Sequence, residues 1–242
     1  MKKLGILLMS ACIALASLSS CNTNDSDMAR NSCFAVVYST SSGLTFQTDD
    51  NQLLLVGNNR VTGYQGSIGD RVILSFNFMK ADEMTSTYID AVIDLYGISE
   101  VRWGETDSVD DAEELKALGE ASVVLYADNM LSATEGILNM ALAYYGTTPD
   151  KHTMTLVENH DPDYAPTTTA EGYLNLELRH NDKEKVNTSG YAEWISFDLT
   201  EFNTMGYKGL IIGMTNFNNQ KVYAKVDFTE IESDEEQIRP AL

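Results

Sequence analysis

Apolar and polar residues alternate with a period of two along residues 33–103 of this sequence. The pattern is clearest in two segments, whose apolar residues are Val72, Leu74, Phe76 and Phe78 and then Ile89, Ala91, Ile93 and Leu95. Successive side chains of a β-strand point to opposite faces, so this pattern is typical of strands that bury one face. Clusters of Gly, Asn, Asp and Ser separate five such segments. The alternation therefore predicts a small closed barrel of the OB type over residues 33–103.

Residues 104–119 interrupt the alternation. Ser108 and Asp111 have the spacing of a helix-capping pair, and Gly119 can end a helix. Apolar residues three apart lie between them, namely Ala112, Leu115 and Leu118. We therefore expect a short acidic helix that links the barrel to a second domain.

An internal repeat marks the second domain, which we place at residues 120–232. Residues 135–142, EGILNMAL, recur 36 residues later as residues 171–178, EGYLNLEL. The first copy alone would also fit a helix, but Leu174, Leu176 and Leu178 of the second copy alternate with polar residues, which favours strands. Each copy is followed by a polar loop and a further strand, at 153–157 and 194–199. We therefore expect two similar hairpins that face each other in a β-sandwich, and an all-β fold for the whole chain.

The N-terminus has the pattern of a bacterial lipoprotein signal peptide over residues 1–20. Lys2 and Lys3 precede an apolar run that is too short to span a bilayer, and the sequence LSSC follows at 18–21. Cys21 is therefore the predicted site of lipidation and of membrane anchoring. Residues 21–32 are polar and predict a flexible tether. We expect a cell-envelope protein, anchored in the outer membrane and facing either the periplasm or the outside.

Acidic residues dominate the charge of the chain. Without residues 1–20, which contain two lysines and no acids, 14 Lys and Arg stand against 36 Asp and Glu, a formal charge of −22. Residues 233–242 form an acidic C-terminal tail. Such a charge repels phosphate backbones, so nucleic acid is excluded as a partner. A basic protein or a neutral glycan meets no such barrier.

Motifs for catalysis and for cofactor or metal binding are missing from the sequence. It contains no Gly-x-Ser-x-Gly, no Ser-x-x-Lys and no phosphate-binding loop. The three histidines, His152, His160 and His180, lack the close spacing of paired metal ligands. We therefore expect no catalytic, cofactor or metal site, and we expect Cys33 to be a buried filler rather than a reactive thiol.

Three aromatic residues of the second domain fall on the polar side of their predicted strands. They are Tyr173, Trp194 and Tyr223. Aromatic side chains among polar ones can stack on sugar rings or anchor a protein partner, so these three residues form the candidate partner-binding face. The alternative is that they are only cross-strand pairs, or that the face packs against the N-terminal domain.

Three sequence stretches in this order resemble the NigD-like lipoproteins of Bacteroidota. They are GDRVILSF at 69–76, GYLNL at 172–176 and ISFDL at 195–199, after a lipobox cysteine. The resemblance implies an N-terminal OB-like domain and a C-terminal β-sandwich. It implies no catalytic residues and suggests self-protection against a bacteriocin. The expected function is thus non-enzymatic binding of a protein partner, with a glycan-binding surface lipoprotein as the alternative.

Overall fold

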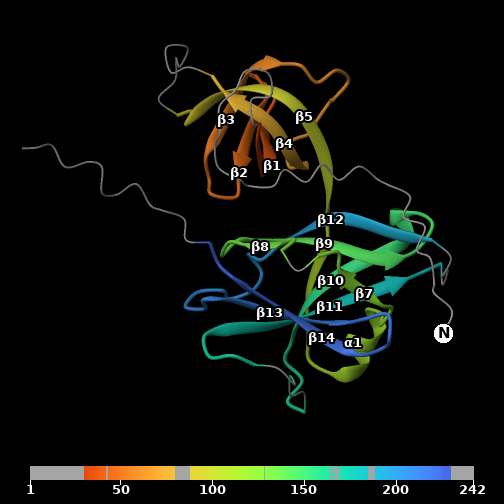
Figure 1. Cartoon of the computed structure of the whole chain (residues 1–242). Coiled ribbons are helices and arrows are strands. Elements are labelled where there is room, and N and C mark those ends of the chain that lie inside the picture. The colour runs from red at the N-terminus through yellow and green to blue at the C-terminus, as the bar shows by residue number, and fades with distance from the viewer. Residues whose placement is uncertain are drawn as a thin grey trace, which may run out of the picture. The chain divides into compact units, whose positions relative to one another are not determined.

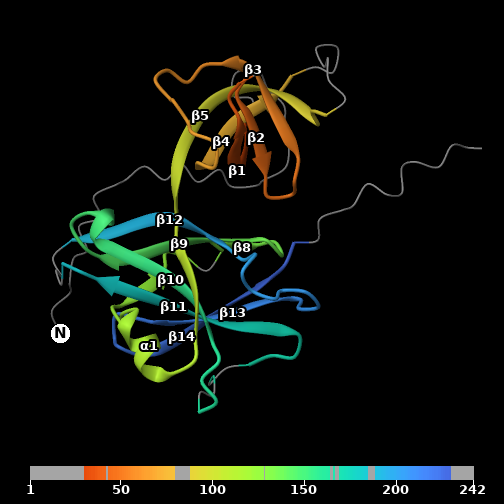
Figure 2. The same cartoon turned by 180° about the vertical axis from the view of Figure 1, so that it is seen from behind.

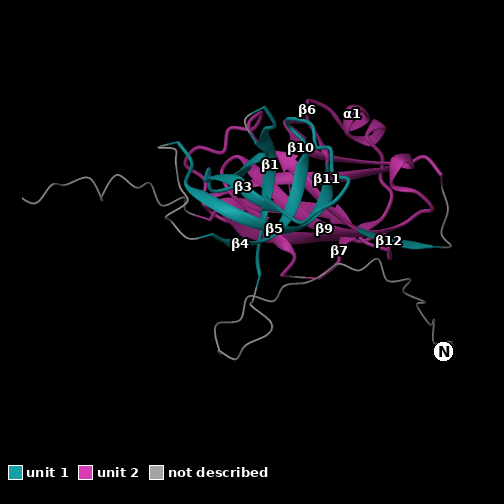
Figure 3. Ribbon diagram, turned by 90° about the horizontal axis from the view of Figure 1, so that it is seen from above, with its two compact units in different colours: residues 1–102, 187–192 teal, residues 103–186, 193–242 magenta. Residues whose placement is uncertain are grey.

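The computed structural model describes residues 30–229 except 42, 80–87, 128, 164–165, 167–168 and 185–188. The predicted signal peptide, Cys21 and the acidic tail lie outside the described residues. The chain divides into two compact units, Met1–Arg102 with Asn187–Ala192 and Trp103–Val186 with Glu193–Leu242 (Figure 3). The predicted all-β fold, a small barrel followed by a β-sandwich, is confirmed.

The first unit is a five-stranded barrel (Figure 1). Its strands are β1 (Asn31–Ser39), β2 (Thr45–Thr48), β3 (Leu53–Asn59), β4 (Arg71–Phe78) and β5 (Ala91–Trp103). The strand order is β3-β2-β1-β4-β5, and β3 also pairs with β5 in parallel, which closes the ring. Closure leaves no free sheet edge between the first and last strands.

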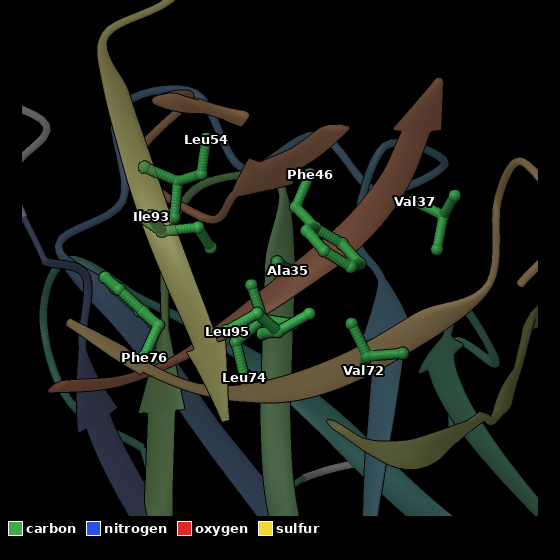
Figure 4. Close-up of a cluster of buried hydrophobic side chains, with 9 residues drawn as sticks. All are labelled: Ala35, Val37, Phe46, Leu54, Val72, Leu74, Phe76, Ile93 and Leu95. Atoms are coloured by element: carbon green, nitrogen blue, oxygen red, sulfur yellow. The ribbon is translucent and has the colours of Figure 1, made fainter. Parts of the chain in front are cut away.

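Alternating side chains of all five strands fill the barrel. Figure 4 shows the nine that make up its core, which are Ala35, Val37, Phe46, Leu54, Val72, Leu74, Phe76, Ile93 and Leu95. Each is at most 3% exposed. Val72, Leu74 and Phe76 show how the period-two pattern of the sequence becomes the inward face of a strand.

The barrel begins two residues earlier than the sequence suggested. Asn31 and Ser32 belong to β1, and the Ser32 hydroxyl donates a hydrogen bond to the Leu74 carbonyl at 2.9 Å. The prediction that the tether extends to residue 32 is therefore wrong at its last residues. These residues are polar, but β1 pairs with β4 from Asn31 to Val36, and main-chain pairing does not require apolar side chains.

A buried ion pair joins β4 to the turn after β2. The Arg71 side chain is 0% exposed, and its Nη1 lies 2.6 Å from Asp49 Oδ1. Its Nη2 donates to Asp49 Oδ2 at 2.7 Å, so the contact is bidentate. The guanidinium also lies 5.3 Å from the centre of the Phe34 ring. Such a buried charge is tolerated only while its partner is present.

Cys33 packs against the barrel core, and its thiol should be unreactive. Burial raises the pKa of Cys33 from 9.0 to about 12, and the nearby carboxylates of Asp49 and Asp50 add to the rise. Only the thiolate reacts, so at pH 8 we expect alkylation by iodoacetamide to be about 1,000-fold slower than for a thiol of pKa 9.0. Mass spectrometry over time can measure this rate, with the denatured chain as the control. Equal rates in the native and denatured chains would contradict the prediction.

The second unit is a sandwich of two sheets (Figure 2). The first sheet contains β7 (Val123–Leu125), β8 (Leu131–Ala133), β9 (Ile137–Tyr145) and β12 (Gly190–Asp198), with both β7 and β8 paired to β9. The second has the order β14-β13-β11-β10-β6. Its strands are β6 (Glu105–Val109), β10 (His152–Asn159), β11 (Tyr173–Asp182), β13 (Gly209–Thr215) and β14 (Lys221–Asp227).

The two copies of the repeat are strands, as predicted, but they do not form two hairpins. The first copy lies in β9 and the second in β11, so each sheet contains one copy. After β9 the chain passes through a short 3-10 turn, η2 (Pro149–Lys151), and enters the other sheet as β10, which pairs with β11. The expected hairpin pairing is wrong because the chain crosses from one sheet to the other between β9 and β10 and again between β11 and β12. This crossing directs the leucine-bearing sides of both copies into one core.

Residues 104–119 are part of the sandwich and not a linker. β6 pairs in parallel with β10. A short helix, α1 (Ala112–Ala117), follows, and its first turn is capped by Asp111, whose carboxylate accepts from the amides of Glu113 and Glu114. The predicted cap Ser108 lies in β6 instead. The sequence hides this strand because it is an edge strand with exposed acidic side chains, which blurs the apolar alternation.

Candidate binding surface

Tyr173 and Tyr223 lie on the same face of the five-stranded sheet. Tyr173 is paired across β11 and β13 with Gly209, which is paired with Asp227 of β14. Tyr223 is paired with Gly213, which is paired with Glu177 of β11. The residues that alternate with these are in the sandwich core, among them Leu174, Leu176, Leu210, Ile212 and Ala224. Both tyrosines therefore lie on the side of the sheet that faces away from the core, which we call the outer face.

Tyr173 is tied to β14 by two contacts. Its hydroxyl donates to Asp227 Oδ1 at 2.6 Å, and Lys225 Nζ lies 4.0 Å from the centre of its ring. The hydrogen bond with Tyr173 raises the pKa of Lys225, and the charge of Asp227 adds to this effect. Tyr173 is thus held by a hydrogen bond at its hydroxyl and by a lysine over its ring, and that lysine keeps its positive charge at the surface.

Tyr223 and Lys221 fold over a glycine. A Cβ atom on Gly213 would lie 2.9 Å from Lys221 Cε and 3.2 Å from Tyr223 Cε1, so both side chains lie close to the main chain of β13. Lys221 Nζ also pairs with Glu177 Oε2 at 2.6 Å. Glycine at 213 thus gives the outer face a flat platform on which an aromatic ring rests.

Two charged side chains of β11 are buried on the outer face. Glu177 is 3% exposed and Arg179 is 5% exposed, although both are on the outer face. Arg179 Nη1 lies 3.4 Å from Glu177 Oε2, and its Nη2 lies 3.1 Å from Glu120 Oε1. Glu120 follows α1, and Ala121 then donates to the His180 carbonyl, so this segment reaches the end of β11. The remaining outer face toward β14 carries the tyrosines and lysines.

Trp194 does not join the two tyrosines. It lies on β12, which belongs to the other sheet of the sandwich. Ser196 shares its side of the strand and is fully buried, where its hydroxyl donates to Asn139 at 2.6 Å. The prediction of one face with all three aromatics is therefore wrong. Strand register shows which side of its own strand a residue occupies, but it does not show to which of two sheets that strand belongs.

Sequence reasoning missed the lysines of this surface. Residues 202–226 contain Lys208, Lys221 and Lys225 and no aspartate or glutamate, in a chain with 36 acids. This charge signal is visible in the sequence. The contribution of Gly213 is not, because it depends on which strands lie on either side of it.

A second polar cluster lies inside the sandwich. His152 Nδ1 and His180 Nε2 are hydrogen-bonded at 2.9 Å, and His180 Nδ1 lies 3.1 Å from the Ser122 carbonyl. The Tyr144 ring packs against both imidazoles, at 4.7 and 5.2 Å between ring centres. His180 lies on β11 and is 2% exposed. Within the described ranges no three His, Cys, Asp or Glu residues come together as metal ligands.

Glu184, which lies beside this cluster, should make the stability of the folded chain depend on pH. The Thr147 hydroxyl and the amides of Thr147 and Thr148 donate to its carboxylate. The Thr147 hydroxyl is the main cause that lowers the pKa of Glu184 from 4.5 to about 2, with the two amides and Lys151 adding. Because the folded pKa is lower, the stabilisation is present above pH 4.5 and is lost as the pH falls toward 2.

We expect Glu184→Gln to lower the free energy of unfolding at pH 7, and we expect the difference from wild type to shrink between pH 4.5 and pH 2.5. Urea denaturation at several pH values measures both quantities. A difference that stays constant over this range would contradict the assignment.

A family model described as the NigD-like C-terminal beta sandwich domain matches residues 107–228. No curated protein has a sequence that matches the chain. The match begins within β6 and ends just after β14, so it includes the edge strand and the helix that sequence reasoning had placed in a linker.

Several solved structures share the fold. A protein of unknown function from Bacteroides vulgatus superposes with a TM-score of 0.66 at 18% identity, covering 83% of this chain and 92% of that one. A candidate lipoprotein from Bacteroides fragilis gives 0.58 at 12% identity, covering 83% and 98%. A NigD-like immunity protein from Bacteroides caccae gives 0.54 at 17% identity, covering 82% and 94%. At these identities the likeness is one of fold.

Proposed function

The chain belongs to the NigD-like family, and on that premise we propose that it is a non-enzymatic, lipid-anchored protein of the cell envelope that binds a protein partner. The proposed role is self-protection against a bacteriocin. The observation that carries the binding proposal is the outer face of β11, β13 and β14, where Tyr173 and Tyr223 lie among lysines. Tyrosine contributes large contact areas at protein interfaces at a low entropy cost.

The similar structure from Bacteroides caccae supports the self-protection role. That protein is described as a NigD-like immunity protein, and it aligns with most of this chain. Immunity proteins act by binding, so they need a surface and not a catalytic centre. A face with two ordered tyrosines on a rigid sheet meets this need.

The lipid anchor is proposed at Cys21, with the protein in the outer membrane. The signal pattern supports it, as does the similar structure described as a candidate lipoprotein. Within the described part of the chain, no helix has the length and apolarity needed to cross a bilayer. Cys21→Ala should move the mature chain from the detergent phase to the aqueous phase in a phase-partition experiment. Equal partitioning of the variant and the wild type would contradict the anchor.

Photo-crosslinking on intact cells tests the binding surface. We expect p-benzoylphenylalanine at position 223 to give an adduct of one defined mass. The same group at position 38, an exposed tyrosine of the barrel, serves as the control and should not give that adduct. No specific adduct at 223 would contradict the proposal, and an adduct with polysaccharide would indicate the glycan alternative.

Once the crosslinked partner is purified, Tyr223→Ala should weaken its binding by about 30-fold, or roughly 2 kcal/mol, because the variant loses a central aromatic contact. Calorimetry measures the affinity. An unchanged affinity in a folded variant would remove Tyr223 from the binding surface.

A further inference from the structure

Two aromatic side chains, Tyr145 and Phe217, meet at the surface of the sandwich. Tyr145 is the last residue of β9 in the first sheet, and Phe217 lies in the loop between β13 and β14 of the second sheet. Their ring centres are 4.7 Å apart, and the ring planes are inclined to each other by 52°. Tyr145 is 36% exposed and Phe217 is 41% exposed, so each ring packs against the other and keeps part of its surface open to solvent.

Hydrogen bonds fix the loop that carries Phe217. The Asn216 carboxamide oxygen accepts from the amides of Asn218 and Gln220, at 2.9 and 3.0 Å. The Asn216 amide donates to the Gln220 carbonyl, and the Asn219 amide donates to the Asn216 carbonyl, each at 2.9 Å. Asn219 has a φ of 56°, in the left-handed region that asparagine tolerates better than most residues. The Phe217 ring is thus presented by a preorganised turn, which lowers the entropy cost of binding a ligand.

The residues that follow Phe217 in this loop have uncharged amide side chains. Asn218, Asn219 and Gln220 are exposed, and their side-chain amides make no hydrogen bond to the described part of the chain. A carboxamide offers two N–H donors and a carbonyl acceptor. The three side chains can therefore bind hydroxyl groups, which both donate and accept hydrogen bonds.

Both segments that form this surface lack charged residues. Residues 137–149, which include Tyr145, and residues 209–220, which include Phe217, contain no Asp, Glu, Lys or Arg, in a chain with 36 acids and 16 bases. Lys221 follows the loop, but its ammonium is paired with Glu177 at 2.6 Å. An anionic ligand is repelled by the rest of the chain and finds no positive charge in these two segments. This surface therefore suits a ligand that is polar but neutral.

We propose that the aromatic pair of Tyr145 and Phe217, together with the amides of residues 218–220, binds a neutral sugar ring of a glycan. One face of such a ring presents C–H groups with partial positive charge, which pack against the negative face of an aromatic ring. The hydroxyl groups at the edge of the sugar pair with the carboxamides. This site goes beyond the proposed binding of a protein partner, and it consists of other residues than Tyr173 and Tyr223.

Neutral disaccharides are the probes for this site. We suggest saturation-transfer NMR on the full mature chain with cellobiose, maltose, lactose and mannobiose. The expected result is saturation transfer to the ring C–H protons of at least one of these sugars. Digalacturonic acid has a similar size but carries carboxylates, so it should receive no transfer from this acidic chain.

Variants of one residue test the aromatic contact. Phe217→Leu keeps an apolar side chain but removes the ring, so it should weaken sugar binding by about tenfold or more. Phe217→Tyr keeps the ring and should retain binding. Phe78→Leu is the matched control, because Phe78 is an exposed phenylalanine of the barrel whose ring lies 5.2 Å from that of Phe76, and it should leave binding unchanged. Circular dichroism of the three variants checks that the fold is intact.

The proposal is overturned if none of the four sugars binds, or if Phe217→Leu and Phe78→Leu weaken binding equally. An adduct from p-benzoylphenylalanine at position 217 with the same protein as at position 223, without sugar binding, would show that the loop belongs to the protein interface instead. In that case the proposed function stands while this inference fails. Sugar binding that depends on Phe217, with no adduct at position 223, would support this site and reject the protein-binding surface.

Discussion

Phe197→Ala should lower the free energy of unfolding of the sandwich by about 3–5 kcal/mol. Phe197 is 0% exposed and lies on β12 between Ile195 and Leu199, both also fully buried. A Cβ atom on Gly104 would lie only 2.2 Å from Phe197 Cε1, so the ring touches the main chain at this glycine. Removing the ring leaves a cavity that the rigid strands around it cannot close.

Chemical denaturation monitored by circular dichroism measures this loss. Trp194→Ala is the matched control, since Trp194 is a large aromatic on the same strand but is only partly buried. We expect a clearly smaller loss for Trp194→Ala than for Phe197→Ala. Equal losses would show that the two sides of β12 are equally packed and that the assignment of the core side is wrong.

Asp49→Ala should destabilise the barrel by about 3–5 kcal/mol, because it leaves the Arg71 guanidinium buried without its bidentate partner. The cost comes from the unpaired charge and not from the lost carboxylate itself. The double variant Asp49→Ala/Arg71→Met should therefore recover much of the stability, since methionine fills the space without a charge.

Denaturation of the two variants side by side measures this effect. Asp94→Ala is the control, because Asp94 pairs with the exposed Arg60 and its loss should cost far less. If the double variant were as unstable as Asp49→Ala alone, packing rather than charge would explain the loss.

Much of the fold could be predicted from local patterns in the sequence. The strands of the barrel follow from the alternation of residues such as Val72, Leu74 and Phe76, because burying one face of a strand requires apolar residues at every second position. The repeat at 135–142 and 171–178 correctly predicted two strands and a sandwich. The outer position of Tyr173 and Tyr223 also follows from register, since the residues that follow them, Leu174 and Ala224, are buried in the core.

Other features depend on contacts between distant segments. β6 has few apolar residues, and it is a strand because β10 supplies its main-chain hydrogen bonds. Arg71 can be buried because the fold brings it next to Asp49, which lies 22 residues earlier in the sequence.

The composition of the candidate surface was likewise decided by tertiary structure. Alternation placed Trp194 correctly on one side of its strand, but the crossing of consecutive strands between sheets put it apart from Tyr173 and Tyr223. Gly213 became part of the surface only because β11 and β14 lie on either side of it. A sequence encodes the two sides of each strand through local periodicity, whereas the choice of neighbouring strand depends on long-range pairing and packing, which periodicity does not record.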